Sequence, residues 1–214
     1  MKLYSFFRSS ASYRVRIALN LKKLNYGQIP IHLRRGGGEQ LSPSYKTVNP
    51  QGLVPTLEDG GRLIPQSLAI IEYLEECYPE PPLLPREPGD RAIVRGMALA
   101  VACEIHPIQN LRVLNYLRNE LKHPEEDVNA WARHWIALGL SALEQTVLSL
   151  SKRPRFCFGD APSMADLCLV PQLYNARRFG CDLSAYTSLL GIEANCIALP
   201  AFAEAAPENQ PDAE

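Results

Sequence analysis

Five of the ten residues from Pro79 to Pro88 are prolines, and this run divides the chain into two parts with different sequence patterns. Proline fixes φ and has no amide hydrogen, so the run is predicted to be a stiff, extended linker. Strand-like and helical patterns alternate before it, whereas only helical patterns follow it. We therefore expect two domains, residues 1–80 and 90–214, joined by a linker at residues 81–89.

The composition is that of a globular protein and argues against several kinds of partner. Hydrophobic residues make up 46% of the chain, charged residues make up 21%, and the formal net charge is −1. No overall basic field is available to bind nucleic acid or an acidic membrane surface. No apolar run reaches the roughly 18 residues that a membrane-spanning helix needs, and residues 1–8 do not have the pattern of a signal peptide.

The six cysteines and four histidines are scattered without the spacing of a metal site, and no CxxC motif occurs. A disulfide framework is not expected in a chain of this size and composition. We expect the cysteines to be small, buried, apolar residues in a protein of the reducing cytoplasm, and we expect no metal.

The first domain is predicted to begin with a strand, a helix and a second strand. Such a βαβ unit implies parallel strands with a right-handed crossover. A loop, a hairpin that turns at Glu58-Asp59-Gly60-Gly61, and a further helix complete the domain. The elements are expected at residues 2–7 (strand), 13–21 (helix), 26–33 (strand), 34–50 (loop), 53–57 and 62–64 (hairpin) and from residue 66 (helix).

The second domain is predicted to be entirely helical, which makes the fold class α/β followed by all-α. Ser163 and Asp166 have the spacing of a capping box, in which Asp166 reaches back to the Ser163 amide. Pro171 is expected to kink the same helix, and the polar tail at 207–214 is expected to be loosely packed. The helices are expected at residues 91–121, 125–150, 163–179 and 184–199.

The first helix is predicted to begin at a run of serines beside Arg8. A helix N-terminus attracts anions, and in thioredoxin-like domains this junction stabilises the thiolate of a CxxC motif. Here the position reads Ser9-Ser10-Ala11-Ser12, which supplies hydroxyl donors but no thiol. We infer that the thiolate comes from outside, as glutathione, with its pKa lowered from about 8.5 to about 6.5. The alternative is that the serines only cap the helix.

Two further segments of the first domain suit a small peptide ligand. Gln66 and Ser67 open another helix, where they could bind a carboxylate or simply cap the helix. Pro55 lies inside a strand pattern, so the strand should be an edge strand or contain an unusual peptide bond. On an edge strand, Val54 could offer both of its backbone groups to an extended peptide such as glutathione.

Taken together, these motifs resemble the zeta class of glutathione transferases, which includes maleylacetoacetate and maleylpyruvate isomerases. The resemblance covers nearly the whole chain. It rests on FRSSASYRVRIAL (7–19), NPQGLVPTL (49–57), QSLAIIEYLEE (66–76), IHPIQNL (105–111), SMADLCLVPQ (163–172) and NQPD (209–212). It implies a thioredoxin-like glutathione-binding domain, an all-helical substrate-binding domain and a homodimer.

The resemblance also implies where glutathione binds. Ser9 and Ser10 would lie against the glutathione sulfur, Gln40 would hold the glycyl end, and the Val54 backbone would pair with the cysteinyl residue. The γ-glutamyl carboxylate would be bound as well. Its partners would be Gln66 and Ser67, with His106, Asn110 and Arg112 close by. Many members have a cysteine where this chain has Ala11, so that cysteine has no part in the chemistry here.

The implied reaction is a cis–trans isomerisation of a small unsaturated diacid. Addition of a thiolate turns the double bond into a single bond that rotates, and elimination restores the alkene in its trans form. Arg8, Arg112 and Arg178 are proposed to hold the substrate carboxylates, although arginines in such positions can also be solvated or paired with acidic side chains. His106 is a proton shuttle, a glutathione ligand or a structural residue.

Four functions remain open at this point. The first is isomerisation of maleylacetoacetate in the breakdown of aromatic amino acids (tyrosine and phenylalanine), and the second is the same chemistry on maleylpyruvate in gentisate breakdown. The third is a general glutathione transferase or dehalogenase, which would consume glutathione. The fourth is a glutathione-binding scaffold without enzymatic activity.

Overall fold

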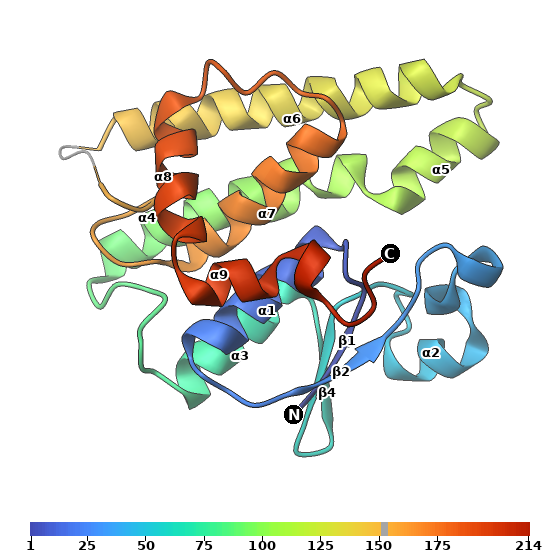
Figure 1. The fold of residues 1–214 in the computed structure, drawn as a ribbon, viewed down its shortest axis with the longest axis horizontal. Coiled ribbons are helices and arrows are strands. Elements are labelled where there is room, and N and C mark those ends of the chain that lie inside the picture. The colour runs from blue at the N-terminus through green and yellow to red at the C-terminus, as the bar shows by residue number, and fades with distance from the viewer. Residues whose placement is uncertain (151–153) are drawn as a thin grey trace. The chain divides into compact units, whose positions relative to one another are not determined.

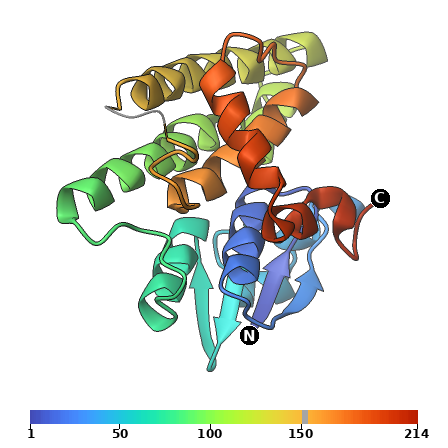
Figure 2. The same ribbon diagram turned by 60° about the vertical axis from the view of Figure 1, so that its left-hand side comes forward.

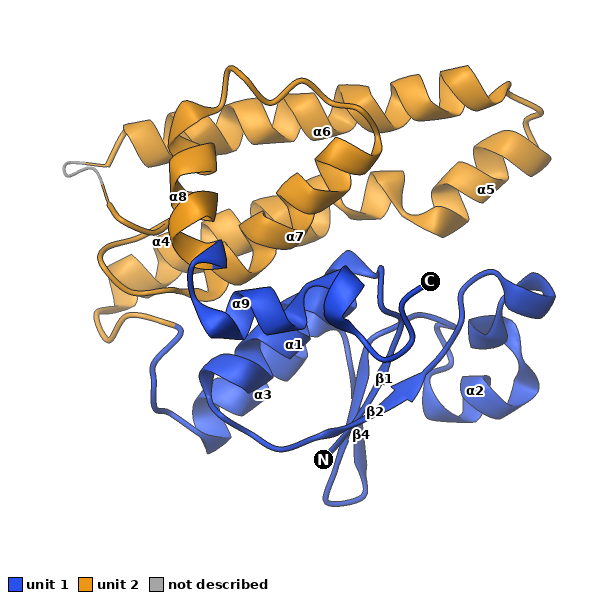
Figure 3. Ribbon diagram, in the orientation of Figure 1, with its two compact units in different colours: residues 1–83, 197–214 blue, residues 84–196 orange. Residues whose placement is uncertain are grey.

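The computed structural model describes residues 1–150 and 154–214 and divides into two compact units. The first unit comprises Met1–Leu83 together with Ile197–Glu214, and the second comprises Leu84–Cys196 (Figure 3). The last residues of the chain thus belong to the same unit as the first ones.

The first unit is built around a four-stranded sheet in the order β2-β1-β3-β4 (Figure 2). β1 and β2 are parallel, which confirms the predicted βαβ unit, and β3 runs antiparallel to both β1 and β4. Gly60 and Gly61 form the turn of the predicted hairpin, with φ of 54° and 78°, values that glycine adopts without strain. The strands are Lys2–Ser5 (β1), Gly27–Pro30 (β2), Thr56–Asp59 (β3) and Arg62–Pro65 (β4).

Four helices accompany this sheet in the part of the first unit that the structure describes. α1 packs against both α3 and α9, and Figure 1 shows α2 on the other side of the sheet. The segment 34–50 was expected to be a loop, and this expectation is wrong in part. Ser42 caps a helical turn and Pro43 is its first residue, which is how α2 begins. The helices are Ser10–Leu21 (α1), Pro43–Val48 (α2), Ser67–Cys77 (α3) and Pro200–Ala205 (α9), and 3₁₀ turns lie at Arg35–Gly37 and Glu39–Leu41.

A buried ion pair fastens the start of the proline-rich segment to the first unit. The Lys22 ammonium donates to Glu75 at 2.8 Å and to the carbonyl oxygens of Tyr78 (2.6 Å) and Pro81 (3.0 Å). Both oxygens of Glu75 accept from the Leu83 amide at 3.0 Å. Because every charge here has a close partner, the chain between α3 and residue 83 has a defined path.

The second unit is helical, as predicted, but the expected helix at 91–121 is not continuous. Pro107 lacks the amide hydrogen that would continue the helical ladder, and Asn110 adopts an extended conformation that caps a new helix. A π-helical segment, Ala100–Ile105, and a 3₁₀ turn, Pro107–Gln109, therefore separate two α-helices. The helices are Pro88–Leu99 (α4), Leu111–Asn119 (α5), Glu125–Leu148 (α6), Met164–Arg178 (α7) and Thr187–Ile197 (α8).

The predicted capping box at the start of α7 is confirmed. Asp166 is completely buried, and one of its oxygens accepts from the Ser163 amide at 2.8 Å. Its other oxygen accepts from the Cys157 amide at 2.7 Å, so the carboxylate also fixes the loop that precedes the helix. Pro171 lies within α7, which continues through it.

The expectation of a loosely packed tail is wrong. Gln210 is buried, and its amide nitrogen donates to the carbonyl oxygens of Glu204 and Ala206, each at 2.8 Å. The Asp212 side chain then accepts from the Phe7 amide. Two of the tail's polar side chains, Gln210 and Asp212, therefore bind main-chain groups, although most of its other residues are exposed.

None of the helices within 1–150 and 154–214 is long and apolar enough to cross a membrane. In the same residues, no group of three or more histidine, cysteine or acidic side chains is arranged to hold a metal ion.

The approach of α6 to the π-helical segment predicts opposite effects for two identical substitutions. A methyl group on Gly139 would overlap the Ile105 side chain, whereas one on Gly191 would meet nothing within 4 Å. We expect Gly139→Ala to lower the free energy of unfolding by about 1–3 kcal/mol, and Gly191→Ala to raise it by up to about 1 kcal/mol. Urea unfolding of both variants measures this, and equal effects would contradict the close packing at Gly139.

Candidate functional site

The junction between β1 and α1 brings together Ser9 and Ser10, as predicted. Ser9 is the N-cap residue of α1, and its hydroxyl accepts from the Ser12 amide at 3.2 Å. Ser10 is the first residue of the helix and is largely buried. The helix N-terminus therefore presents amide groups and two serine hydroxyls together, an arrangement suited to an anion.

The loop that leads into this helix is held on several sides. The Phe7 amide donates to Asp212 at 2.9 Å, and the Phe7 carbonyl accepts from Arg16 at 2.8 Å. The Arg8 guanidinium stands over the Phe7 ring, 5.6 Å from its centroid. The positions of Arg8 and Ser9 thus depend on contacts from within α1 and from the end of the chain.

Arg16 is the central member of this support. Its side chain is fully buried, and it also donates to the carbonyl oxygens of Ala205 (2.9 Å) and Phe6 (3.4 Å) and to the Ser5 hydroxyl (3.3 Å). Burial lowers the pKa of Arg16 to about 10, which leaves the guanidinium charged at neutral pH. In the sequence, Arg16 stands out only as part of the family motif at residues 7–19.

A polar contact that was not predicted from the sequence joins the start of α3 to α1. The Ser67 hydroxyl accepts from Arg14 of α1 at 3.2 Å, and both side chains are buried. Gln66 precedes the helix with a φ of 71° and is exposed, and its side chain donates to Gln51 at 2.8 Å. Gln66 and Ser67 are thus held from α1 and from the loop before β3.

The Val54-Pro55 peptide bond is cis, which confirms the unusual-bond alternative. The edge-strand alternative is wrong, because β3 begins at Thr56 and lies between β1 and β4. Two side chains, Tyr45 and Asn49, donate to the Leu53 carbonyl at 2.7 and 2.8 Å and so fix the residue before Val54. No described residue forms a hydrogen bond with the Val54 amide or carbonyl, so both groups are available to a ligand.

Gln40 lies in the 3₁₀ turn that follows the glycine-rich loop. Its side chain is buried, and its nitrogen donates to the Leu33 carbonyl at 3.4 Å. Its side-chain oxygen is buried without a hydrogen-bond partner among the residues that the structure describes. A Cβ on Gly38 would lie 2.6 Å from the Gln40 side-chain nitrogen, so glycine is needed there. An open hollow of about 390 Å³ is lined by the neighbouring loop residues 35–39, 41 and 42.

The remaining predicted residues belong to the second unit. His106 ends the π-helical segment, and its Nε2 lies 3.4 Å from the Asn110 side-chain nitrogen. Asn110 caps α5 by accepting from the Arg112 amide at 3.3 Å, and the Arg112 side chain is exposed. The structure therefore brings His106 and Asn110 together and places Arg112 on the first turn of α5.

A chain of buried amide side chains connects this segment to α7. Gln109 accepts from Asn175 at 2.8 Å and lies 3.5 Å from Gln172, and all three residues are buried. Asn175 in turn accepts from Arg178 at 3.4 Å. Gln109 and Asn175 cannot be singled out from the sequence, because buried amides leave no pattern that separates them from exposed ones.

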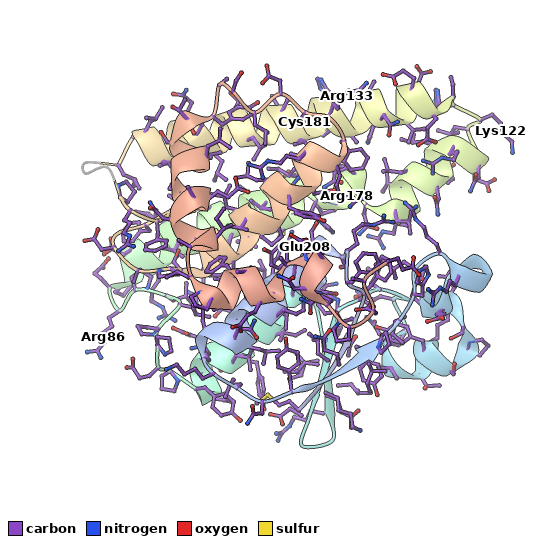
Figure 4. The ribbon with its side chains drawn as sticks, viewed as in Figure 1. Arg86, Lys122, Arg133, Arg178, Cys181 and Glu208 are labelled. Atoms are coloured by element: carbon purple, nitrogen blue, oxygen red, sulfur yellow. The ribbon has the colours of Figure 1, made fainter. Side chains whose placement is uncertain are left out.

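The neighbouring Arg177 binds a carboxylate and not an amide. Its guanidinium donates two hydrogen bonds to the two carboxylate oxygens of Glu193 in α8, and the bond from Nη1 measures 2.6 Å. Figure 4 marks Arg178 on α7. The two arginines are adjacent in sequence, but one is tied to a carboxylate of α8 and the other to the amide chain.

No candidate nucleophile emerges from the cysteines whose pKa the structure perturbs. Burial raises the pKa of the Cys157, Cys181 and Cys196 thiols, and nearby Asp166 raises the pKa of Cys157 and Cys196 further. These thiols remain protonated at neutral pH. A thiolate at the α1 N-terminus has to come from a ligand, because residue 11 is alanine.

Comparison with known proteins gives close matches over the whole chain. Residues 3–82 match the family model for the N-terminal domain of glutathione S-transferase. The maleylacetoacetate isomerase of Pseudomonas aeruginosa is 51% identical over 213 residues, which cover 99% of this chain and 98% of that protein.

Two solved structures are similar in fold as well as sequence. A holo structure of maleylpyruvate isomerase, a bacterial glutathione S-transferase in the zeta class, is 47% identical with a TM-score of 0.97 and covers 100% of both chains. The maleylacetoacetate isomerase of Anaeromyxobacter dehalogenans 2CP-1 is 44% identical with a TM-score of 0.86, covering 100% of this chain and 93% of that one. The latter contains dicarboxyethyl glutathione and citrate in its active site.

The support that Arg16 gives to the β1–α1 loop predicts a large effect of its removal. We expect Arg16→Met to lower the free energy of unfolding by about 2–4 kcal/mol, because it leaves buried carbonyl groups without donors. Arg62→Met, at an exposed position of β4, should change stability by less than about 0.5 kcal/mol. Denaturant unfolding of both variants checks this, and similar values would show that the buried guanidinium has no special role.

Proposed function

Because this chain belongs to the zeta class of glutathione transferases, we propose that it is a glutathione-dependent cis–trans isomerase that converts maleylacetoacetate to fumarylacetoacetate. The observation that carries the proposal is the N-terminus of α1, where Ser9 and Ser10 offer hydroxyls and the third position, Ala11, offers no thiol.

The residues of the first unit fit glutathione. The unpaired backbone groups of Val54 suit an extended peptide, and the buried Gln40 oxygen lacks a donor that a peptide amide could supply. Gln66 and Ser67, at the start of α3, suit the γ-glutamyl carboxylate. We assign His106, Asn110 and Arg112 of the second unit to the same ligand on the family resemblance.

Bound glutathione would supply a thiolate that adds to the cis double bond, and its elimination after rotation leaves the trans alkene and an unchanged thiol. The chain's own part is to hold that sulfur as an anion. Hydroxyl donors at Ser9 and Ser10 and the positive end of α1 both favour the charged form. The dicarboxyethyl glutathione in the Anaeromyxobacter relative is a thioether between glutathione and a dicarboxylic acid, which supports this chemistry.

The substrate carboxylates require cations, and we propose Arg8, Arg112 and Arg178 for this task. Arg8 adjoins the serine pair in the first unit and is oriented by the Phe7 ring. Arg178 donates to the side-chain oxygen of Asn175 at 3.4 Å, and the neighbouring Arg177 binds Glu193. The citrate in the Anaeromyxobacter relative supports a site for carboxylates.

Maleylpyruvate is the second candidate substrate. The relative with a TM-score of 0.97 is a maleylpyruvate isomerase, and both substrates carry two carboxylates around a cis double bond. Side-by-side turnover of the two compounds separates them. Net consumption of glutathione would instead favour a general transferase, and failure to bind glutathione would favour a scaffold without activity.

We further propose that the protein works as a homodimer in the cytoplasm. The proposal of a homodimer rests on the family resemblance. The proposal of a cytoplasmic location rests on the reaction's need for reduced glutathione and on the free state of the six cysteines, which a reducing compartment maintains.

The serine pair yields a test of the mechanism. Wild-type isomerisation should require glutathione and leave its concentration unchanged. We expect Ser9→Ala and Ser10→Ala each to move the pH midpoint of activity upward, toward the value of about 8.5 for a free thiol, because a donor to the thiolate is lost. Ser9→Ala should also cost about 1 kcal/mol of stability, because Ser9 is the N-cap.

Ser12→Ala is the matched control for the serine pair. Its hydroxyl is buried in the same helical turn, and the proposal gives it no contact with the sulfur, so the pH profile should not move. Activity without glutathione in the wild type would end the proposal. An unchanged pH profile in both Ser9→Ala and Ser10→Ala would remove these hydroxyls from it.

The two adjacent arginines of α7 yield a test of substrate binding. Arg178→Ala should raise the KM for the diacid about 10-fold or more and leave the KM for glutathione within about two-fold, because a charged hydrogen bond to a carboxylate is lost. Arg177→Ala should lower stability through loss of the Glu193 contact and leave both KM values unchanged. Steady-state kinetics with each substrate varied decides the matter, and the reverse pattern would assign the carboxylate to Arg177.

A further inference from the structure

The amide of Phe7 needs an acceptor that the sheet does not supply. β1 ends at Ser5, two residues earlier, and Phe7 is buried. A buried amide without a partner is costly, and the Asp212 carboxylate accepts from this one at 2.9 Å across 205 positions of sequence. A charged acceptor makes the stronger kind of hydrogen bond.

The chain end that carries Asp212 is itself fixed. Gln210, two residues before, is buried and is held by two carbonyl oxygens and by Gln28, whose side chain lies 2.9 Å away. The Ala213 amide closes a turn by donating to the Gln210 carbonyl at 3.0 Å. The carboxylate is therefore presented to Phe7 from an anchored turn and not from a loose end.

Both main-chain groups of Phe7 are thus bound from outside the loop, the carbonyl by Arg16 and the amide by Asp212. Arg8 follows directly and stacks on the Phe7 ring, and Ser9 follows Arg8 and caps α1. A rotation of the Phe7 peptide would change the direction of Arg8 and the approach to the helix N-terminus. Small displacements of catalytic groups reduce rates strongly.

We propose that Asp212 is a positioning residue for the isomerase reaction, which acts by holding the Phe7 amide so that Arg8, Ser9 and the N-terminus of α1 keep their catalytic geometry. This inference rests on the proposed function, because it assigns the reaction to that junction. Asp212 acts through its acceptor oxygen and has no contact with the reacting atoms.

The test compares three variants of the full-length protein. Asp212→Ala removes the acceptor, and Asp212→Asn keeps an acceptor oxygen without the charge. Glu208→Ala is the matched control, since it removes an exposed carboxylate from the same tail, marked in Figure 4. Each is measured for melting temperature, for kcat and both KM values with maleylacetoacetate and glutathione, and for hydrogen exchange of the peptide that contains residues 6–12.

We expect Asp212→Ala to lower kcat about 10- to 100-fold while the protein remains folded at the assay temperature. Exchange of the 6–12 peptide should accelerate, Asp212→Asn should recover most of the kcat, and Glu208→Ala should match the wild type. Wild-type kcat in Asp212→Ala would overturn the proposal. Equal losses in Asp212→Asn and Asp212→Ala would also overturn it, because the charge and not the acceptor would then matter.

A fold defect and a failure of the proposed function are told apart from these outcomes. If Asp212→Ala does not fold, Asp212→Asn still tests the proposal, because a large loss of kcat in Asp212→Asn but not in Glu208→Ala would overturn it. If the wild type does not isomerise either maleyl acid, the proposed function fails. Hydrogen exchange then still reports whether Asp212 holds the Phe7 amide.

Discussion

The buried guanidinium of Arg16 is the interaction on which the first unit depends. Burying a charge is unfavourable unless its hydrogen bonds are satisfied, and this one is satisfied mainly by main-chain oxygens. Those oxygens belong to two places: the loop after β1, at Phe6 and Phe7, and the end of α9, at Ala205. One side chain thereby determines both the entry to the candidate site and the return of the C-terminal segment to the first unit.

Much of the fold could be predicted because its signals are local. The hairpin follows from Gly60-Gly61, the capping box follows from Ser163 and Asp166, and the parallel βαβ unit follows from one helical pattern between two strand patterns. The break in the 91–121 helix also has a local signal, because Pro107 lacks the amide hydrogen that would continue the helical ladder. Helix α2 was missed because its six residues are too few to show periodicity.

The packed tail could not be predicted, because what fixes it is distant in sequence. Pro207 and the polar residues after it have the composition of a loose end. Their order is explained only when Gln210 is seen to bind carbonyl groups and Asp212 to accept from Phe7. A polar side chain that binds main-chain groups and one that faces solvent are identical in a single sequence, so only the structure distinguishes them.

The parts of the candidate site that depend on local backbone geometry could be predicted from the sequence. Ser9 at a helix start and Val54 beside a cis proline are consequences of local chain geometry, and both are found where the sequence indicates.

Which arginine faces a ligand is a different question, because it depends on the partners of each side chain. Arg177 and Arg178 are adjacent and identical in sequence, yet Arg177 binds Glu193 of α8 and Arg178 donates to Asn175. Glu193 neutralises Arg177 as well as fixing it, whereas the amide of Asn175 carries no charge of its own. The buried amide chain through Gln109 packs the π-helical segment against α7, and it also contacts Arg178, the arginine proposed to bind the diacid.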